Sequence, residues 1–160
     1  RSSEDVLNAA IDELLENRER EGERLKSLIL QRVDVIEKIV IDSRAKMPQI
    51  QARYQQKLRD RLAEMDIEVN SDRLEQELVH MAQKMDVDEE LDRLECHLKE
   101  MRDVLSREEA VGRRLDFLMQ ELNREANTLG SKSADISSTN ASVELKVLIE
   151  QMREQIQNIE

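Results

Sequence analysis

The chain contains almost no residues that end a helix or form a turn. Its 160 residues include one proline and three glycines, whereas a protein of strands and tight turns needs many more of both. Leu, Glu, Arg and Gln, which all favour helix, are abundant. Apolar residues also recur with helical spacing, which a disordered chain lacks. We therefore expect an all-α protein.

The scarcity of aromatic residues limits the kind of helical fold. The sequence has one Phe, one Tyr and no Trp, so few large side chains are present to fill a compact globular core. Charged residues make up 38% of the chain, which predicts narrow apolar stripes and wide solvated faces on the helices. Long helices packed through Leu, Ile, Val and Met fit this composition.

The first part of the chain, residues 1–70, is expected to form a long helical hairpin. Leu7, Ile11 and Leu14 begin an apolar stripe, and Pro48 is expected to mark the turn of the hairpin. Between the early and late apolar residues lies the stretch NREREGER, which contains no apolar side chain. A helix that is polar all round spans solvent, pairs its own charges or serves a site.

The second part, residues 71–160, is expected to form an antiparallel helical bundle. Asn70 or Ser71 is expected to cap its first helix and Asp86 its second, and Gly130 to end its third. The last helix carries apolar residues at alternating spacings of four and three, which predicts a coiled-coil-like seam. The seam consists of Leu145, Ile149, Met152, Ile156 and Ile159.

Charge and targeting signals exclude several classes of protein. The formal net charge of −11 argues against binding nucleic acid by bulk electrostatics, so a polyanion would need a local basic patch or a bound metal ion. No apolar run approaches the roughly 20 residues that cross a bilayer, and no signal peptide is recognisable. The single Cys96 cannot form an internal disulfide. We expect a cytoplasmic protein with no membrane partner and, because it begins with Arg1, a fragment of a longer one.

One edge of the predicted helix at residues 87–101 carries polar residues about one turn apart. Asp86, Glu90, Arg93 and His97 border its apolar arc. Carboxylates bind hard cations and histidine exchanges protons near neutral pH, so this edge suits a metal or proton-transfer site. A capped helix with surface salt bridges explains the same residues.

The predicted helix at residues 112–130 is unusually polar. Glu121 and Glu125 lie one turn apart on one edge, and Asn123 and Asn127 lie on the other side. Asn is unfavourable inside helices, so its repeated use needs a reason other than helix propensity. A buried polar network and a functional site both supply one.

The common catalytic motifs are absent. The sequence has no Gly-rich phosphate loop, CxxC pair, GxSxG elbow or HExxH motif. His80 is expected to be a packing or surface histidine, and Cys96 to fill space beside the apolar face of its helix.

Three longer strings resemble the C-terminal region of the bacterial YicC-like endoribonucleases. They are RLEQELVHMAQKMDVDEELDRLECHLKEM, VGRRLDFLMQELNREANTLGSK and VELKVLIEQMREQIQNIE, and the stretch NREREG extends the resemblance over nearly all of the chain. The resemblance implies a metal-dependent endoribonuclease that hydrolyses single-stranded or small structured RNA with Mn²⁺ or Mg²⁺. It also implies that residues 71–160 form a catalytic-type domain and that the family's separate N-terminal domain is absent from this chain. Assembly of identical chains is a further expectation, a hexamer being one form expected of the full-length protein.

The resemblance also implies roles for particular residues. The implied metal ligands are the carboxylates Glu77, Glu90, Glu121 and Glu125. The implied catalytic residues are His97, Glu90, Glu121 and Glu125. The implied RNA-binding residues are Arg93, Arg113, Arg124, Lys132, Asn123 and Asn127. Further family positions without an assigned role are Glu75, Asp86, Glu89, Asp116 and Gln120. The helix that carries Glu77 is expected to pack against the two polar helices.

Two non-catalytic interpretations remain beside the nuclease. Long helices and a coiled-coil-like seam are typical of an oligomerisation module that binds copies of itself or partner helices. An RNA-binding adaptor that delivers substrate to another nuclease is the third interpretation.

Overall fold

The computed structural model describes residues 2–65, 71–107, 112–132 and 135–159. These residues form helices and no strand, which confirms the expected all-α class. The helices are α1 (Ser3–Glu64), α2 (Ser71–Met85), α3 (Asp88–Leu105), α4 (Gly112–Ser131) and α5 (Ile136–Ile159). No helix in this part of the chain combines the length and the apolar character that crossing a membrane requires.

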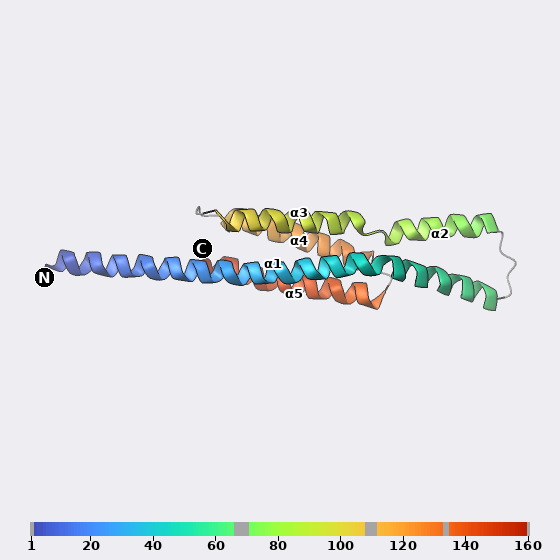
Figure 1. Cartoon of the computed structure of the whole chain (residues 1–160), viewed down its shortest axis with the longest axis horizontal. Coiled ribbons are helices and arrows are strands. Elements are labelled where there is room, and N and C mark those ends of the chain that lie inside the picture. Colours follow the sequence, from blue (N-terminus) through green and yellow to red (C-terminus); the bar gives the residue numbers. More distant parts are fainter. Residues whose placement is uncertain (1, 66–70, 108–111, 133–134, 160) are drawn as a thin grey trace.

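The middle of α1 packs with α3, α4 and α5 into an elongated bundle (Figure 1). Neighbouring helices α3, α4 and α5 run in alternating directions, and α2 lies back along the C-terminal part of α1. The N-terminal part of α1 extends beyond the other helices. Because α3 and α4 run antiparallel side by side, residues near the middle of each helix come to lie opposite one another.

The predicted apolar stripes form the core of this bundle. The α3 stripe consists of the N-cap residue Val87 and of Leu91, Leu94, Leu98 and Met101, all buried. On α4, the buried residues of the predicted stripe are Leu115, Leu118, Leu122, Ala126 and Leu129. The α5 seam is buried at Leu145, Ile149, Met152 and Ile156, and the side chain of Ile159 lies outside the description. The apolar spacing therefore predicted correctly which face of α3, α4 and α5 is buried.

The turn expected at Pro48 is wrong, because α1 continues through this residue to Glu64. Proline removes one backbone hydrogen bond and crowds the preceding turn, which normally kinks or ends a helix. Here Met47 and Ile50, on either side of Pro48, are buried in the core, so packing holds both halves in place. The chain reverses direction later, between α1 and α2 (Figure 1).

Two of the three expected helix ends are displaced by a residue or two. The second cap is nearly as predicted, since Asp86 Oδ1 accepts a hydrogen bond of 2.9 Å from the backbone N–H of Asp88, where α3 begins. Asn70 lies outside the described residues. Gly130 does not end α4, which continues to Ser131.

Gly130 is needed for close packing of α5 on α4. A Cβ atom at Gly130 would lie 2.6 Å from Ser142 Oγ and 3.3 Å from Ser142 Cβ. Ser142 is 2% exposed, and its hydroxyl donates a hydrogen bond of 2.8 Å to the carbonyl of Ala126. The hydroxyl therefore cannot rotate away without leaving a buried group unpaired.

Replacing Gly130 with Ala is expected to destabilise the chain by about 1–3 kcal/mol, since overpacking outweighs the better helix propensity of Ala. Thermal unfolding followed by circular dichroism measures the effect. Gly22→Ala is the matched control, because nothing lies within 4 Å of its added Cβ, and it should stabilise α1 slightly. Equal melting temperatures for the two variants would contradict this reading of the contact.

The N-terminal part of α1 has no packing partner among the described residues. Leu7 is 60% exposed, Ile11 45% and Leu14 57%, and the polar stretch at residues 17–24 crosses solvent between this apolar stripe and the bundle. Of the three readings of that polar stretch, the structure favours a helix that spans solvent.

Candidate metal centre

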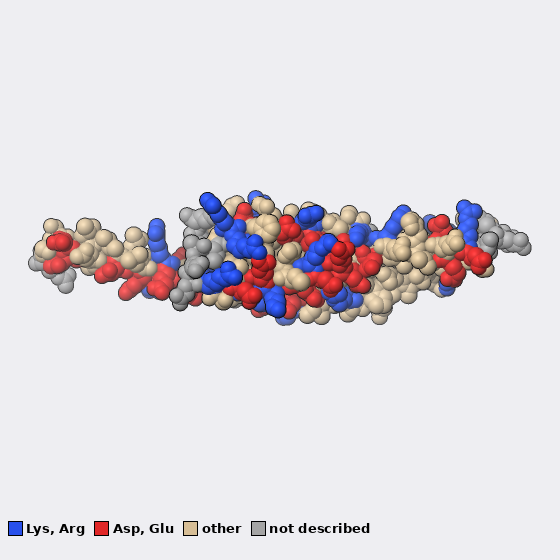
Figure 2. All heavy atoms as spheres, turned by 90° about the horizontal axis from the view of Figure 1, so that it is seen from above, with Lys and Arg blue, Asp and Glu red and all other residues tan. Residues whose placement is uncertain are grey.

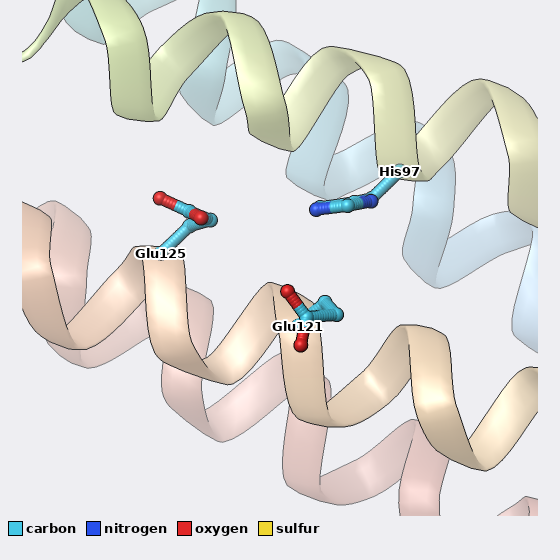
Figure 3. Close-up of side chains that lie close together, drawn as sticks. All are labelled: His97, Glu121 and Glu125. Carbon is cyan, nitrogen blue, oxygen red and sulfur yellow. The ribbon is translucent and has the colours of Figure 1, made fainter.

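Three predicted site residues meet between α3 and α4. His97 projects from α3, and Glu121 and Glu125 project from α4 toward the same space (Figure 3). One potential ligand atom from each residue lies within 4.8 Å of the other two. Two ligands on opposite sides of a Mg²⁺-sized ion lie about 4.2 Å apart. Small side-chain rotations would therefore close the three groups around one divalent cation.

The helical register of α4 explains why two of these residues share the site. Glu121 and Glu125 are four residues apart and therefore point the same way along the helix. Their neighbours Leu122 and Ala126 are fully buried, so this edge of the apolar stripe is held against α3. The site is partly shielded as a result: His97 and Glu121 are half-buried, and Glu125 is 4% exposed.

Glu125 is a buried carboxylate, and among the described residues its ion-pair partner is too distant for a hydrogen bond. The nearest cation in an ion pair with it is Arg93, whose Nη1 lies 3.7 Å from Glu125 Oε2, a separation too long for a hydrogen bond. Arg93 also forms an ion pair with the exposed Glu89 on its own helix. Burial of a carboxylate is costly unless a nearby charge compensates it. A cation held by His97, Glu121 and Glu125 would supply that compensation.

The predicted ligand Glu90 forms an ion pair with Lys132. Glu90 is 3% exposed, and its Oε1 accepts a hydrogen bond of 2.6 Å from Lys132 Nζ. Lys132 Nζ also donates to the backbone carbonyl of Asp86 at 3.4 Å. The second oxygen, Oε2, is buried and has no hydrogen-bond partner among the described residues. The pair joins the start of α3 to the end of α4 and lies outside the three-residue group.

A family model described as "Endoribonuclease YicC-like, C-terminal" matches residues 43–160. The chain belongs to this family.

Two curated relatives agree with this membership. A protein of Haemophilus influenzae named "Probable endoribonuclease YicC" is 49% identical over 162 residues, which cover 99% of this chain and 56% of the relative. A protein of Clostridioides difficile with the same name is 36% identical over 162 residues, covering 97% of this chain and 55% of the relative. The chain thus spans about half the length of these YicC relatives, and the family resemblance seen in the sequence is confirmed.

The remaining implied metal ligand of the YicC family lies elsewhere. Glu77 is exposed on α2, and α2 packs along α1 rather than against α3 and α4, so the expected packing is wrong. The neighbouring Glu75 lies 3.9 Å from Arg59 of α1. Glu77 lies elsewhere because α2 follows the C-terminal extension of α1, which α3 and α4 do not reach.

The expected position of Cys96 is also wrong. Its side chain is exposed on α3 rather than packed beside the core.

The predicted RNA-binding residues of α4 lie on its surface. Arg113, Asn123, Arg124 and Asn127 are exposed, so a buried polar network does not explain the two asparagines. Beside them, Asp116 accepts a hydrogen bond from Gln120 at 3.4 Å. These side chains are accessible to a ligand that approaches α4 from solvent.

The face of the bundle seen in Figure 2 carries no continuous basic surface. Acidic and basic side chains alternate over its middle. Several ion pairs also join neighbouring helices of the bundle. One of these pairs joins Arg114 of α4 to Glu100 of α3, and the Arg114 guanidinium lies 5.2 Å from the centre of the Phe117 ring. A polyanionic ligand would therefore bind this face through local contacts rather than through a broad positive field.

Proposed function

We propose that the chain carries the hydrolytic centre of a metal-dependent endoribonuclease, with Mn²⁺ or Mg²⁺ held by His97, Glu121 and Glu125. The observation that supports this most directly is the convergence of the three side chains from two helices. Two carboxylates suit either hard cation, and the imidazole favours Mn²⁺ over Mg²⁺. The names of both relatives, probable endoribonuclease, agree with RNA as the substrate.

A bound divalent ion would lower the pKa of a water molecule and offset charge on the scissile phosphate. The residues of the chain have complementary tasks. Glu121 and Glu125 hold the ion, and His97 either completes its ligand set or transfers a proton at a ring nitrogen. Arg93 lies beside Glu125 and would move its guanidinium to a substrate phosphate once a cation has taken its place.

The exposed polar residues of α4 would position the RNA. Arg113 and Arg124 offer guanidinium groups for phosphate oxygens, and Asn123 and Asn127 offer amides for sugar hydroxyls. In this proposal Glu90 and Lys132 stabilise the fold rather than contact metal or RNA, since each already has the other as its partner.

Removal of the metal ion and substitution of Glu121 together test the proposal. EDTA is expected to stop cleavage of a labelled single-stranded RNA, and added Mn²⁺ to restore it. Glu121→Gln should weaken Mn²⁺ binding, measured by calorimetry, by roughly 10–100-fold and reduce cleavage in parallel. Glu144→Gln, at an exposed position of α5, is the control. Cleavage that persists in EDTA, or that Glu121→Gln leaves at the wild-type rate, would refute the metal centre.

A second candidate function is self-association through α1. The stripe of Leu7, Ile11 and Leu14 is exposed on the N-terminal part of α1, which has no packing partner in the described part of the chain. Stripes of this kind pair with a second helix. Assembly of identical chains is compatible with the nuclease proposal and does not require it. Sedimentation velocity distinguishes a single monomeric species, which would exclude this function, from a dimer or larger assembly.

A further inference from the structure

Two adjoining hollows lie on α1 beyond the metal-centre residues. The larger has a volume of about 400 Å³. The described residues that line it all belong to α1 and are Tyr54, Lys57, Leu58, Asp60, Arg61 and Glu64. The smaller, of about 240 Å³, is lined by Ile50, Arg53, Tyr54, Lys57 and Asp135. Because Tyr54 and Lys57 line both, the two hollows form one surface feature, which we call the Tyr54 groove.

Tyr54 provides this groove with a fixed aromatic ring. It is half-buried and packs against the hydrophobic core while it lines both hollows. The only other aromatic ring on α1 or α4 is Phe117, which faces the Arg114 guanidinium. A ring held on one side by the core is well suited to stack against a nucleic-acid base, because little side-chain freedom is lost on binding.

Three cations follow the groove along one edge of α1. Arg53, Lys57 and Arg61 are spaced by four residues, so they stand about 6 Å apart along the helix axis. In the described part of the chain none of the three takes part in an ion pair, whereas Arg59 between them lies near Glu75. No described carboxylate therefore holds any of the three at ion-pair distance, so each can turn toward an anionic ligand.

Two of the carboxylates at the groove already have hydrogen-bond donors. Asp60 Oδ1 accepts from Gln56 Nε2 at 2.9 Å, and Asp135 accepts from the backbone N–H and the hydroxyl of Ser137 at the start of α5. The Ser137 hydroxyl lowers the pKa of Asp135 most, and the charges of Arg53 and Lys57 lower it further against the effect of burial. These two cations therefore lie close enough to the groove to influence a charge within it.

We propose that the Tyr54 groove binds one nucleotide of single-stranded RNA, with a base on the Tyr54 ring and flanking phosphates at Arg53 and Lys57. The inference rests on the proposed function, because that function makes RNA the ligand. A small cavity shared by Ile50 and Lys132 adjoins the groove, and Glu90, the partner of Lys132, lies about 10 Å along α3 from His97. The groove would therefore hold the strand away from the bond that is cleaved.

Fluorescence anisotropy of a short labelled single-stranded RNA in EDTA tests this subsite without cleavage. Arg53→Gln and Lys57→Gln should each weaken RNA binding several-fold. Each should also reduce the slope of the logarithm of the binding constant against the logarithm of the salt concentration by about one. Tyr54→Leu should weaken binding about ten-fold, whereas Tyr54→Phe keeps the ring and should bind like wild type. Arg59→Gln is the matched control, since Arg59 stands on the same helix near Glu75.

The possible outcomes separate this subsite from the metal centre. Wild-type RNA affinity in the Arg53, Lys57 and Tyr54 variants, with unchanged melting curves, would overturn the subsite even if Mn²⁺-dependent cleavage is observed. Displacement of the RNA by polyglutamate at equal charge would show that the groove recognises charge alone and would also overturn it. If these variants bind RNA more weakly but the wild-type chain cuts no RNA, the subsite is supported and the nuclease proposal is refuted.

Discussion

Replacing His97 with Ala is expected to lower RNA cleavage by about 10²–10⁴-fold, the usual cost of losing a general acid or base. Its imidazole is the only group from α3 in the three-residue cluster with Glu121 and Glu125. Because His97 is half-buried at the edge of the core, the substitution should change the melting temperature little. Initial rates on a labelled single-stranded RNA at saturating Mn²⁺ measure the loss.

Mn²⁺ binding by the same variant separates the two roles of His97. A ligand role predicts that His97→Ala weakens Mn²⁺ binding roughly 10–100-fold, whereas a proton-transfer role predicts near-normal Mn²⁺ binding with slow cleavage. His80→Ala is the matched control, because the other histidine of the chain is exposed on α2. If His97→Ala cleaves RNA at the wild-type rate, His97 takes no part in the reaction, and the cluster is not supported as an active site.

The helices were predictable because their apolar residues follow a single period. Leu91, Leu94 and Leu98 keep helical spacing and are buried, as the pattern indicates. The turn predicted at Pro48 is wrong because local propensity opposes a helix at this residue, whereas burial of Met47 and Ile50 against distant segments stabilises one. Sequence spacing describes one helix at a time and does not reveal what other helices contribute to it.

The candidate site was predictable only in part for the same reason. Glu121 and Glu125 share one face by helical register alone, but their meeting with His97 depends on how α3 lies on α4. Nothing in the local pattern indicates that Glu77 would follow α1 instead. The stripe of Arg53, Lys57 and Arg61 was visible as a four-residue spacing, yet such a stripe resembles any solvated helix face until the Tyr54 groove is seen.

The pairing of Glu90 with Lys132 predicts a large loss of stability when the lysine is removed. Lys132→Met leaves a carboxylate that is 3% exposed without its positive partner. Loss of one member of a buried pair costs about 3–5 kcal/mol. The Lys132 side chain is 34% exposed, so in the variant water would reach Glu90 and reduce this cost. We therefore expect the free energy of unfolding to fall by about 2–3 kcal/mol. The melting temperature should fall by about 5–10 °C.

The double variant decides whether this loss comes from the unpaired charge. Glu90→Gln keeps the shape of the side chain and removes its charge, so Glu90→Gln with Lys132→Met should melt higher than Lys132→Met alone. Lys46→Met is the control, because Lys46 pairs with Asp42 on the surface of α1 at 2.8 Å and such pairs contribute less than about 1 kcal/mol. A double variant less stable than Lys132→Met would mean that Glu90 is stabilised by something other than the lysine. The loss in the single variant would then arise from the lost packing of the Lys132 methylene groups.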